Sequence, residues 1–161
     1  MLLFRSSTQR QISFGLAILR VVLGATFIMH GGQKLFVYGF AGVTGAFGQM
    51  GIPMPGLLGP LVALVEFFGG IAILLGLLTR LAALGIGATM VVAILTVHLK
   101  AGFFNPQGVE FPLSLLSSAI TLAITGAGAF SIDAILNTRL SPNEAATAAI
   151  ESAAVRARRA A

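Results

Sequence analysis

Residues 57–78 read LLGPLVALVEFFGGIAILLGLL, an apolar run that carries one charge, Glu66, near its middle. About 20 apolar residues are enough for a helix to cross the hydrocarbon core of a bilayer. An ionisable side chain at that depth costs a few kcal/mol unless it is paired, protonated or faces a wet cavity. The run therefore predicts a transmembrane helix in which Glu66 has a structural or functional role that offsets this cost. Two interpretations of Glu66 stay open: a structural ion pair or hydrogen bond that ties helices together, and a carboxyl that handles protons or binds a ligand.

Three more apolar runs, about 14–38, 81–99 and 111–132, are long enough to span a membrane. With 57% hydrophobic and 9% charged residues, the chain is not a soluble globular protein. The runs are continuous rather than alternating, which favours helices over barrel strands. The first run is too long for a signal-peptide core and contains Arg20, so we expect it to remain in the protein. The predicted fold is all-α, a transmembrane four-helix bundle.

Two shorter helices are expected around this bundle. Residues Phe40, Val43, Phe47 and Met50 recur at helical spacing within the glycine-rich segment 39–56, which predicts a short interfacial helix over the mouth of the bundle. The sequence SPNE at 141–144 resembles a capping box and predicts an Ala/Arg-rich cytoplasmic helix. The expected organisation is an N-terminal arm (1–13), a four-helix domain (14–136) and a tail helix (141–161).

The distribution of the positive charges, which give a net charge of +5, indicates how the chain is oriented in the membrane. Most positive residues flank the predicted spans on one side, and the two opposite loops contribute only Lys34 and Lys100. The positive-inside rule therefore predicts that both termini are cytoplasmic. No basic face with interleaved aromatic residues is present, so we expect membrane lipid rather than nucleic acid as a partner. The residues on the positive side are Arg5, Arg10, Arg80, Arg139, Arg156, Arg158 and Arg159.

Polar residues gather in two predicted places. Depth along the first two helices puts Arg20 and Glu66 within several ångströms, which predicts a structural ion pair between them. The alternative is that the long side chain of Arg20 snorkels to the cytoplasmic interface. His30 and Lys34 are four residues apart and should share a helix face at the outer end. His98 is expected at the same depth as His30, and Glu110 follows on that side. The alternative for this outer cluster is an ordinary interfacial lysine with a histidine near the lipid headgroups.

Cofactor chemistry is narrowed by the absence of cysteine, which removes disulfides, thiolate catalysis, cysteine-ligated clusters and a cysteine-based zinc site. Haem ligation by the two histidines lacks supporting sequence. A metal site from His30, His98, Glu66 and Glu110 lacks any local ligand spacing. We therefore predict neither haem nor a metal.

Three motifs together resemble the DoxX family of small four-helix membrane proteins. They are LRVVLG (19–24) leading to HGGQKLF (30–36), EFFGG (66–70) leading to LGLLTR (75–80), and GAGAFSID (126–133). The resemblance covers about 14–136 and implies a bacterial-type inner (plasma) membrane location. It implies Arg20, His30, Lys34, Glu66, Arg80 and Asp133 as family-type polar positions. It also implies a membrane subunit of a thiosulfate:quinone oxidoreductase or of a complex that detoxifies oxidants and thiols.

Two functions follow as hypotheses. In the first, the outer ends of the helices bind a quinone: His30 and Glu66 are catalytic, Glu66 relays protons, and His30, Lys34, His98 and Glu110 bind the cofactor. The electrons would come from a partner or a small reductant, so whether the chain alone is an enzyme stays open. In the second, the chain is a non-catalytic anchor or accessory subunit that docks another membrane protein or a copy of itself. A transporter, the third possibility, would require oligomerisation.

Overall fold

A computed structural model of the protein describes residues 7–140 and 150–158. Within these residues the chain forms helices and connecting turns and no β-strand, as an all-α fold requires. The elements in chain order are α1 (Gln9–Gly32), π-helix η2 (Gln33–Tyr38), α2 (Gly39–Gln49), α3 (Pro55–Leu75), α4 (Thr79–Ala93), π-helix η3 (Ile94–His98), 3₁₀-helix η4 (Leu99–Ala101), α5 (Glu110–Thr125) and α6 (Ile132–Leu140). Residues 150–158 are also helical.

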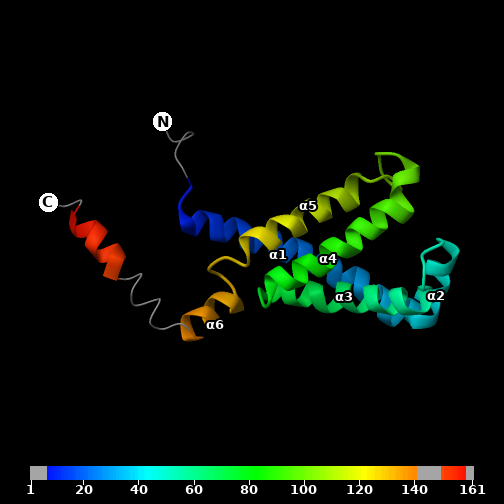
Figure 1. Ribbon diagram of the computed structural model, residues 1–161, viewed down its shortest axis with the longest axis horizontal. Helices are drawn as coiled ribbons and strands as arrows, with labels where there is room; N and C mark the ends of the chain where they lie inside the picture. The colour runs from blue at the N-terminus through cyan, green and yellow to red at the C-terminus, as the bar shows by residue number, and fades with distance from the viewer. Residues whose placement is uncertain (1–6, 141–149, 159–161) are drawn as a thin grey trace.

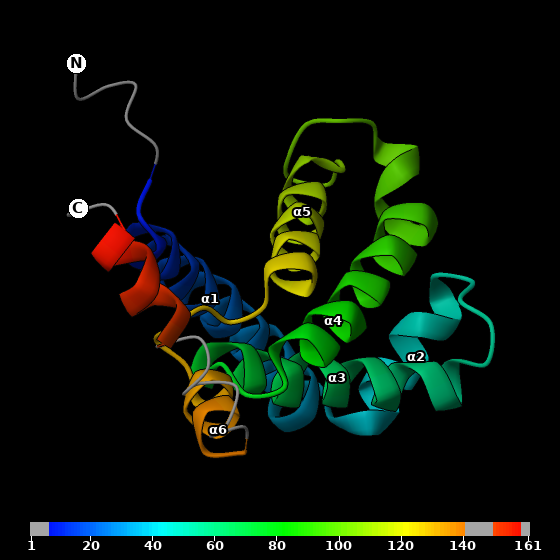
Figure 2. The same ribbon diagram turned by 60° about the vertical axis from the view of Figure 1, so that its left-hand side comes forward.

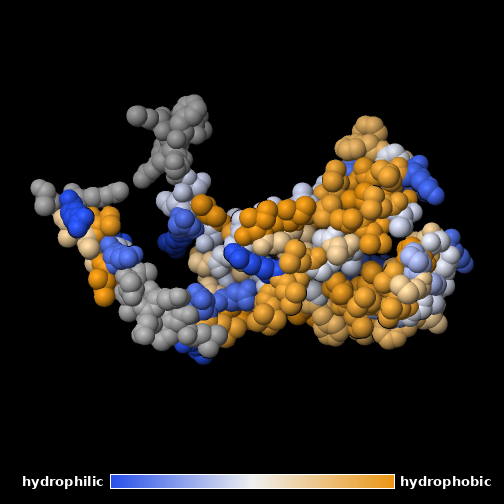
Figure 3. All heavy atoms as spheres, viewed as in Figure 1, coloured by the Kyte–Doolittle hydropathy of each residue, from blue (hydrophilic) through white to orange (hydrophobic). Residues whose placement is uncertain are grey.

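Three helical stretches are long and apolar enough to cross a membrane: Gln9–Gln49, Pro55–Leu75 and Thr79–Ala101. A fourth apolar helix, α5, has 16 residues. That is roughly 24 Å at about 1.5 Å per residue, somewhat short of a hydrocarbon core of about 30 Å. Figure 3 shows apolar side chains covering the surface over these helices, with hydrophilic residues gathered mainly towards the two ends. These helices confirm the predicted fold class, an all-α transmembrane bundle.

The helices pack in the order α1 on α3, α3 on α4, and α4 on α5 (Figures 1 and 2). We call one end of the bundle the terminal end, because it contains the start of α1, the α3–α4 turn and α6. The opposite end, with η2, α2, η3 and the 102–109 loop, we call the π-helix end. The buried core between the ends is formed by apolar residues of all four long helices, including Leu23, Phe27, Ile73, Ile86 and Leu122.

Glycine sets the distance between α1 and α3. A Cβ atom at Gly24 would lie 2.8 Å from the carbonyl oxygen of Gly70 and 2.8 Å from the amide nitrogen of Leu74. Because lipid supplies no hydrophobic drive for helix association, membrane helices rely on such close backbone packing. This contact fixes the register of the two helices and therefore the level of every polar residue that they carry.

Two helix boundaries differ from the prediction. Helix α1 begins at Gln9, not Phe14, because Thr8 and Gln11 form a reciprocal capping box. The fourth long helix was predicted to run to residue 132, but α5 ends at Thr125. Gly126 has φ 77°, a left-handed conformation that stops a helix and suits glycine. The chain then turns and starts α6.

The expected short helix is present as α2, packed on α3. Val43 is buried, and Gly59 on α3 approaches so closely that a Cβ there would lie 3.3 Å from the amide nitrogen of Thr44. Phe47 is partly buried, whereas Phe40 and Met50 are about half exposed. In the tail, the helix over 150–158 agrees with the predicted tail helix, and the predicted capping box at 141–144 lies outside the described residues.

Candidate functional site

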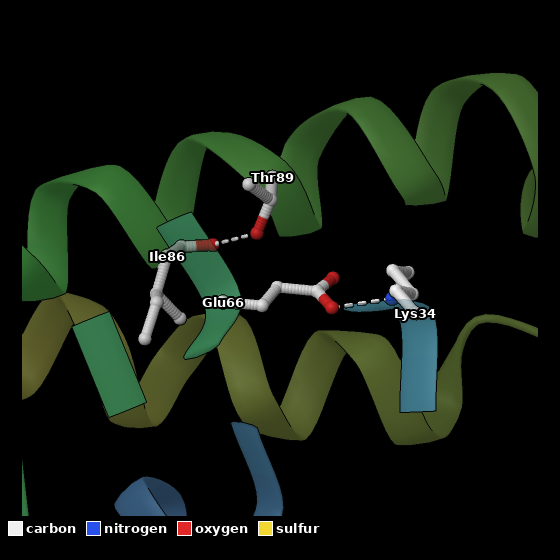
Figure 4. Close-up of polar contacts among 4 residues, drawn as sticks. All are labelled: Lys34, Glu66, Ile86 and Thr89. Carbon is white, nitrogen blue, oxygen red and sulfur yellow. Dashed lines mark hydrogen bonds and ion pairs between the residues drawn. The ribbon is translucent and has the colours of Figure 1, made fainter. Parts of the chain in front are cut away.

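Glu66 does not pair with Arg20, so the predicted ion pair between them is wrong. Its partner is Lys34 of η2, which donates a hydrogen bond to Oε2 of Glu66 (Figure 4). Arg20 instead packs against Gly76 and donates from Nη2 to the carbonyl oxygen of Phe130. Ten residues separate Glu66 from Gly76, roughly 15 Å along a helix at about 1.5 Å per residue. The depth estimate failed because the glycine contact between α1 and α3 sets a different register.

The Lys34–Glu66 pair lies in a small, partly open pocket at the π-helix end, with a volume of about 190 Å³. We call this cavity the interior pocket. Its polar lining residues are Lys34, Glu66, Thr89, Thr96 and His98. Its apolar lining includes Phe47, Met50 and Ile52 from α2 and the loop after it, Val62 from α3, and Val92 and Val97 from α4 and η3. The pocket thus places a carboxylate, an ammonium and an imidazole in one largely apolar enclosure.

Both π-helical segments of the described chain border the interior pocket. Lys34 lies on η2, and Thr96 and His98 lie on η3. A π-helical turn is rare, and it is found frequently at functional sites. Here it brings polar side chains from two separate helices to the same cavity.

His30 does not share a face with Lys34, contrary to the α-helical spacing rule. The chain becomes π-helical at Gln33, and its i→i+5 bonding shifts the direction of the side chains that follow. His30 is exposed and lies in a separate groove of about 570 Å³ on the outside of the bundle. We call it the aromatic groove. Its lining residues are Ile28, Met29, His30, Gly32, Gln33, Phe36, Val37 and Phe67.

Phe67 lines the aromatic groove. Its ring contacts that of Phe36 edge-on, with centroids 5.4 Å apart and planes at 83°. Its neighbour in the chain, Glu66, lines the interior pocket. A Cβ at Gly32 would lie 3.6 Å from the Phe67 ring, so α1 and α3 are in direct contact here. Neighbouring residues of α3 therefore line the two cavities.

His98 and Glu110 have defined partners at the π-helix end. Nδ1 of His98 is 2.8 Å from the carbonyl oxygen of Gln107. Because a carbonyl oxygen only accepts, Nδ1 must be the protonated nitrogen, and Nε2 of the neutral ring is the proton acceptor. Glu110 accepts a 2.7 Å hydrogen bond from the backbone of Asn105 and is not among the residues that line either cavity. The structure therefore brings His98 into the same pocket as Glu66 and Lys34 but leaves Glu110 at the start of α5, outside that pocket.

The family-type polar residues at the other end have structural contacts. Asp133 accepts hydrogen bonds from the backbone N–H groups of Leu78, at 2.7 Å, and Thr79, at 3.0 Å. It thus caps α4 from a distant part of the chain. Arg80 is exposed and lies near the backbone of Gly126. Together with Arg20, these residues hold the α3–α4 turn against the 126–133 segment.

Sequence reasoning missed Thr89 and Thr96 of the interior pocket and Gln33, Phe36 and Phe67 of the aromatic groove. The signal for the threonines was present: residues 89, 92, 93 and 96 all line the pocket and follow the spacing of one helix face. The groove residues were harder to find, because their shared position depends on the π-helical turn and on the α1–α3 contact.

Comparisons with known proteins agree with this architecture. The sequence model of the DoxX family matches residues 15–99. The chain is 40% identical to Inner membrane protein YqjF of Escherichia coli (strain K12) over 124 residues, which is 76% of this chain and 92% of that protein. It is 34% identical to the protein named "Putative oxidoreductase CatD" of Bacillus subtilis (strain 168), over 77% of this chain and 88% of that protein.

A third relative, Uncharacterized membrane protein Rv3486 of Mycobacterium tuberculosis (strain ATCC 25618 / H37Rv), is 35% identical over 75% of this chain and 80% of its own length. No solved structure is significantly similar to the chain. The family match covers more than half of the sequence, and these relatives align with most of it. With its apolar helices, the chain is a membrane protein, and it belongs to the DoxX family.

Proposed function

We propose that this protein is the membrane subunit of a quinone-linked redox system and that the aromatic groove binds the quinone ring. The observation that carries the proposal is the composition of that groove. Hydrogen-bonding side chains, His30 and Gln33, stand beside two aromatic rings, Phe36 and Phe67, on an otherwise apolar outer surface. A planar ring with two carbonyl oxygens and an apolar tail has matching requirements.

The volumes of the two cavities favour the aromatic groove as the quinone site. Pockets for drug-sized molecules usually measure about 300–1,000 Å³. The aromatic groove, at about 570 Å³, lies in that range, and the interior pocket, at about 190 Å³, lies below it. The groove is also bordered by strongly exposed apolar side chains, those of Met29, Phe36 and Val37. In a membrane these side chains meet lipid, the phase in which an isoprenoid quinone is dissolved.

In this proposal the roles of the residues change from the sequence prediction. His30 and Gln33 hydrogen-bond the quinone oxygens, whereas Lys34 is held by Glu66 in the interior pocket. Bound quinone would supply two-electron acceptor chemistry that no side chain provides. The electrons would come from a partner subunit or a small reductant, because the chain has no cysteine to hold a cluster of its own. The relative named as an oxidoreductase supports this redox assignment.

Photolabelling tests the quinone site. Protein in native-like membranes would be irradiated with an azido-substituted quinone, and labelled peptides would be identified by mass spectrometry. We expect label on the segments that contain Met29–Val37 and Phe67, competed by unlabelled quinone. His30→Leu combined with Phe67→Ala should abolish it. Phe103→Ala, which removes another exposed aromatic ring at the same end, is the matched control and should not change it.

Label spread over all exposed apolar surfaces, or label insensitive to the groove variants, would remove the proposal. A stoichiometric co-purifying protein without quinone would favour the alternative, an accessory membrane subunit.

We also propose that the terminal end faces the cytoplasm. Arg10, Arg80 and Arg139 lie at that end, whereas the π-helix end carries Lys34 and Lys100. The cysteine-free sequence permits a direct test. Ser7→Cys and Asn105→Cys place single thiols at opposite ends. In intact cells an impermeant maleimide should label only Asn105→Cys, and the opposite pattern would reverse the orientation.

A further inference from the structure

We infer that the interior pocket is a one-sided proton-exchange site, in which Glu66 takes up and releases protons towards the π-helix end through His98. The inference identifies the proton source for the proposed quinone site and to that extent rests on the proposed function. The exchange itself needs no quinone. It is argued from the burial of Glu66, the polar lining of the pocket, the hydrogen bond of His98 and the apolar core between Glu66 and Arg20.

Glu66 combines burial with access to a cavity. The residue is 4% exposed and lies within a helix apolar enough to span a membrane. Lys34 pairs with one of its carboxylate oxygens, Oε2. The other oxygen, Oε1, has no hydrogen-bond partner in the described chain and is not fully buried. It is therefore accessible from the pocket. A structural ion pair alone would not require a cavity beside it.

The cavity has the size and lining to hold water. Its volume of about 190 Å³ is several times the roughly 30 Å³ that one water occupies in the liquid. Thr89 donates its hydroxyl proton to the carbonyl of Ile86, at 2.8 Å, and Thr96 donates to that of Val92, at 2.7 Å. Their hydroxyl oxygens are therefore left to accept from water. Lys34 adds donors and Glu66 adds an acceptor, which gives a water file the two to four partners it needs.

His98 connects this water to the π-helix end. Its Nδ1–H is fixed on Gln107 of an exposed loop, so Nε2 is the atom that exchanges a proton with the pocket. An imidazole is the side chain best suited to pass protons near neutral pH. His98 on η3 and Lys34 on η2 line the same pocket, so each of the two π-helical turns contributes a titratable side chain to it.

The proton balance is simple. A protonated His98 gives its Nε2 proton, through water, to the Glu66 carboxylate and becomes neutral, and the reverse step returns the proton. Lys34 takes no part in the transfer and donates its hydrogen bond to Oε2 of Glu66. Lys34 and His98 are the titratable groups that line the pocket with Glu66. Helix α2 has no titratable residue, Arg80 of α4 lies at the terminal end, and His30 of α1 faces the aromatic groove.

In the part of the chain that the structure describes, packed apolar side chains separate Glu66 from the terminal end. Between Glu66 and Arg20 the packed core contains Leu23, Phe27 and Ile73, which are almost completely buried. Exchange is therefore directed to one side of the membrane.

The test uses the full chain in oriented liposomes and infrared difference spectroscopy after a pH jump on one side. The C=O stretching band of protonated Glu66 is assigned by its loss in Glu66→Gln. In the unaltered protein this band should respond quickly to a jump on the π-helix side and slowly to a jump on the other side. His98→Gln should slow the fast response by about a hundredfold, the lower end of what a positioned acid–base group contributes. His30→Gln, which alters the other histidine, should leave it unchanged.

A second variant distinguishes loss of proton transfer from loss of folding. In His98→Ala, added imidazole should restore the fast response, which a merely structural role for His98 would not allow. A Glu66 band that never responds to pH, an equal response from both sides, or an unchanged rate in His98→Gln would each overturn the inference. Failure of quinone photolabelling with intact proton exchange would remove only the proposed function. The reverse result would remove only this inference.

Discussion

Lys34 and Glu66, 32 residues apart in the chain, form an ion pair that joins η2 to α3 inside an apolar bundle. The side chain of Glu66 is 5% exposed and that of Lys34 is 22% exposed, so most of the pair is removed from water. Breaking a buried pair by removing one partner leaves an uncompensated charge, which is more costly than removing both. This asymmetry gives the pair a measurable signature.

Lys34→Met should destabilise the protein by about 3 kcal/mol, the low end of the usual range because Lys34 is partly exposed. Glu66→Gln should cost less, because it leaves Lys34 able to reach solvent. The double variant should recover part of the loss, with a coupling energy of about 1–3 kcal/mol. Unfolding in mixed detergent micelles would measure all three. Lys100→Met, which removes an exposed lysine at the same end, is the control and should be nearly neutral. Additive single effects would contradict a direct pair.

Arg20 and Glu66 should behave as independent sites. Roughly 15 Å of helix separates their levels, and they share no partner. Distant positions without shared contacts usually add to within about 0.5 kcal/mol. The double-mutant cycle of Arg20→Gln and Glu66→Gln, measured by the same unfolding assay, should therefore show no coupling beyond that value. A coupling energy above about 1 kcal/mol would support the Arg20–Glu66 ion pair predicted from the sequence and contradict the observed register of α1 and α3.

The helices could be predicted from the sequence because each apolar run is a local signal. The run around Glu66 and its glycine and proline ends locate α3 without reference to other helices. The register between helices is a different matter, because it depends on where backbones meet. The contact of Gly24 with Gly70 shifts Arg20 to the level of Gly76, and nothing in either run alone specifies that shift.

The site was predictable in part for the same reason. Placing His98 and Lys34 at the same end needed only helix direction and length, and the structure puts both in the interior pocket. Separating His30 from Lys34 required the π-helical turn at Gln33, which depends on tertiary packing. The α-helical rule of i, i+4 neighbours could not anticipate it.

Gly24→Ala should destabilise the bundle, whereas Gly15→Ala on the same helix should not. A Cβ at Gly24 would lie 2.8 Å from backbone atoms of α3, which cannot move aside as a flexible side chain would. Overpacking of this kind costs about 1–3 kcal/mol. At Gly15 nothing lies within 4 Å of the added Cβ, so alanine should gain about 0.5–1 kcal/mol of helix stability. Thermal unfolding in detergent would compare them, and equal midpoints would argue against the close α1–α3 contact.

Asp133→Ala should loosen the start of α4. The Asp133 carboxylate accepts hydrogen bonds from the N–H groups of Leu78 and Thr79, which otherwise have no intrahelical partner. Losing such a cap costs about 1–2 kcal/mol. Asp133→Asn retains one acceptor oxygen and should have an intermediate effect. The readouts are the unfolding midpoint and the rate of trypsin cleavage after Arg80, which lies in the first turn of α4 and should become more accessible. Asn137→Ala, an exposed position one turn later in α6, is the control. If Asp133→Ala matches that control in both readouts, the carboxylate does not hold the turn, and Asp133 must be explained by another role.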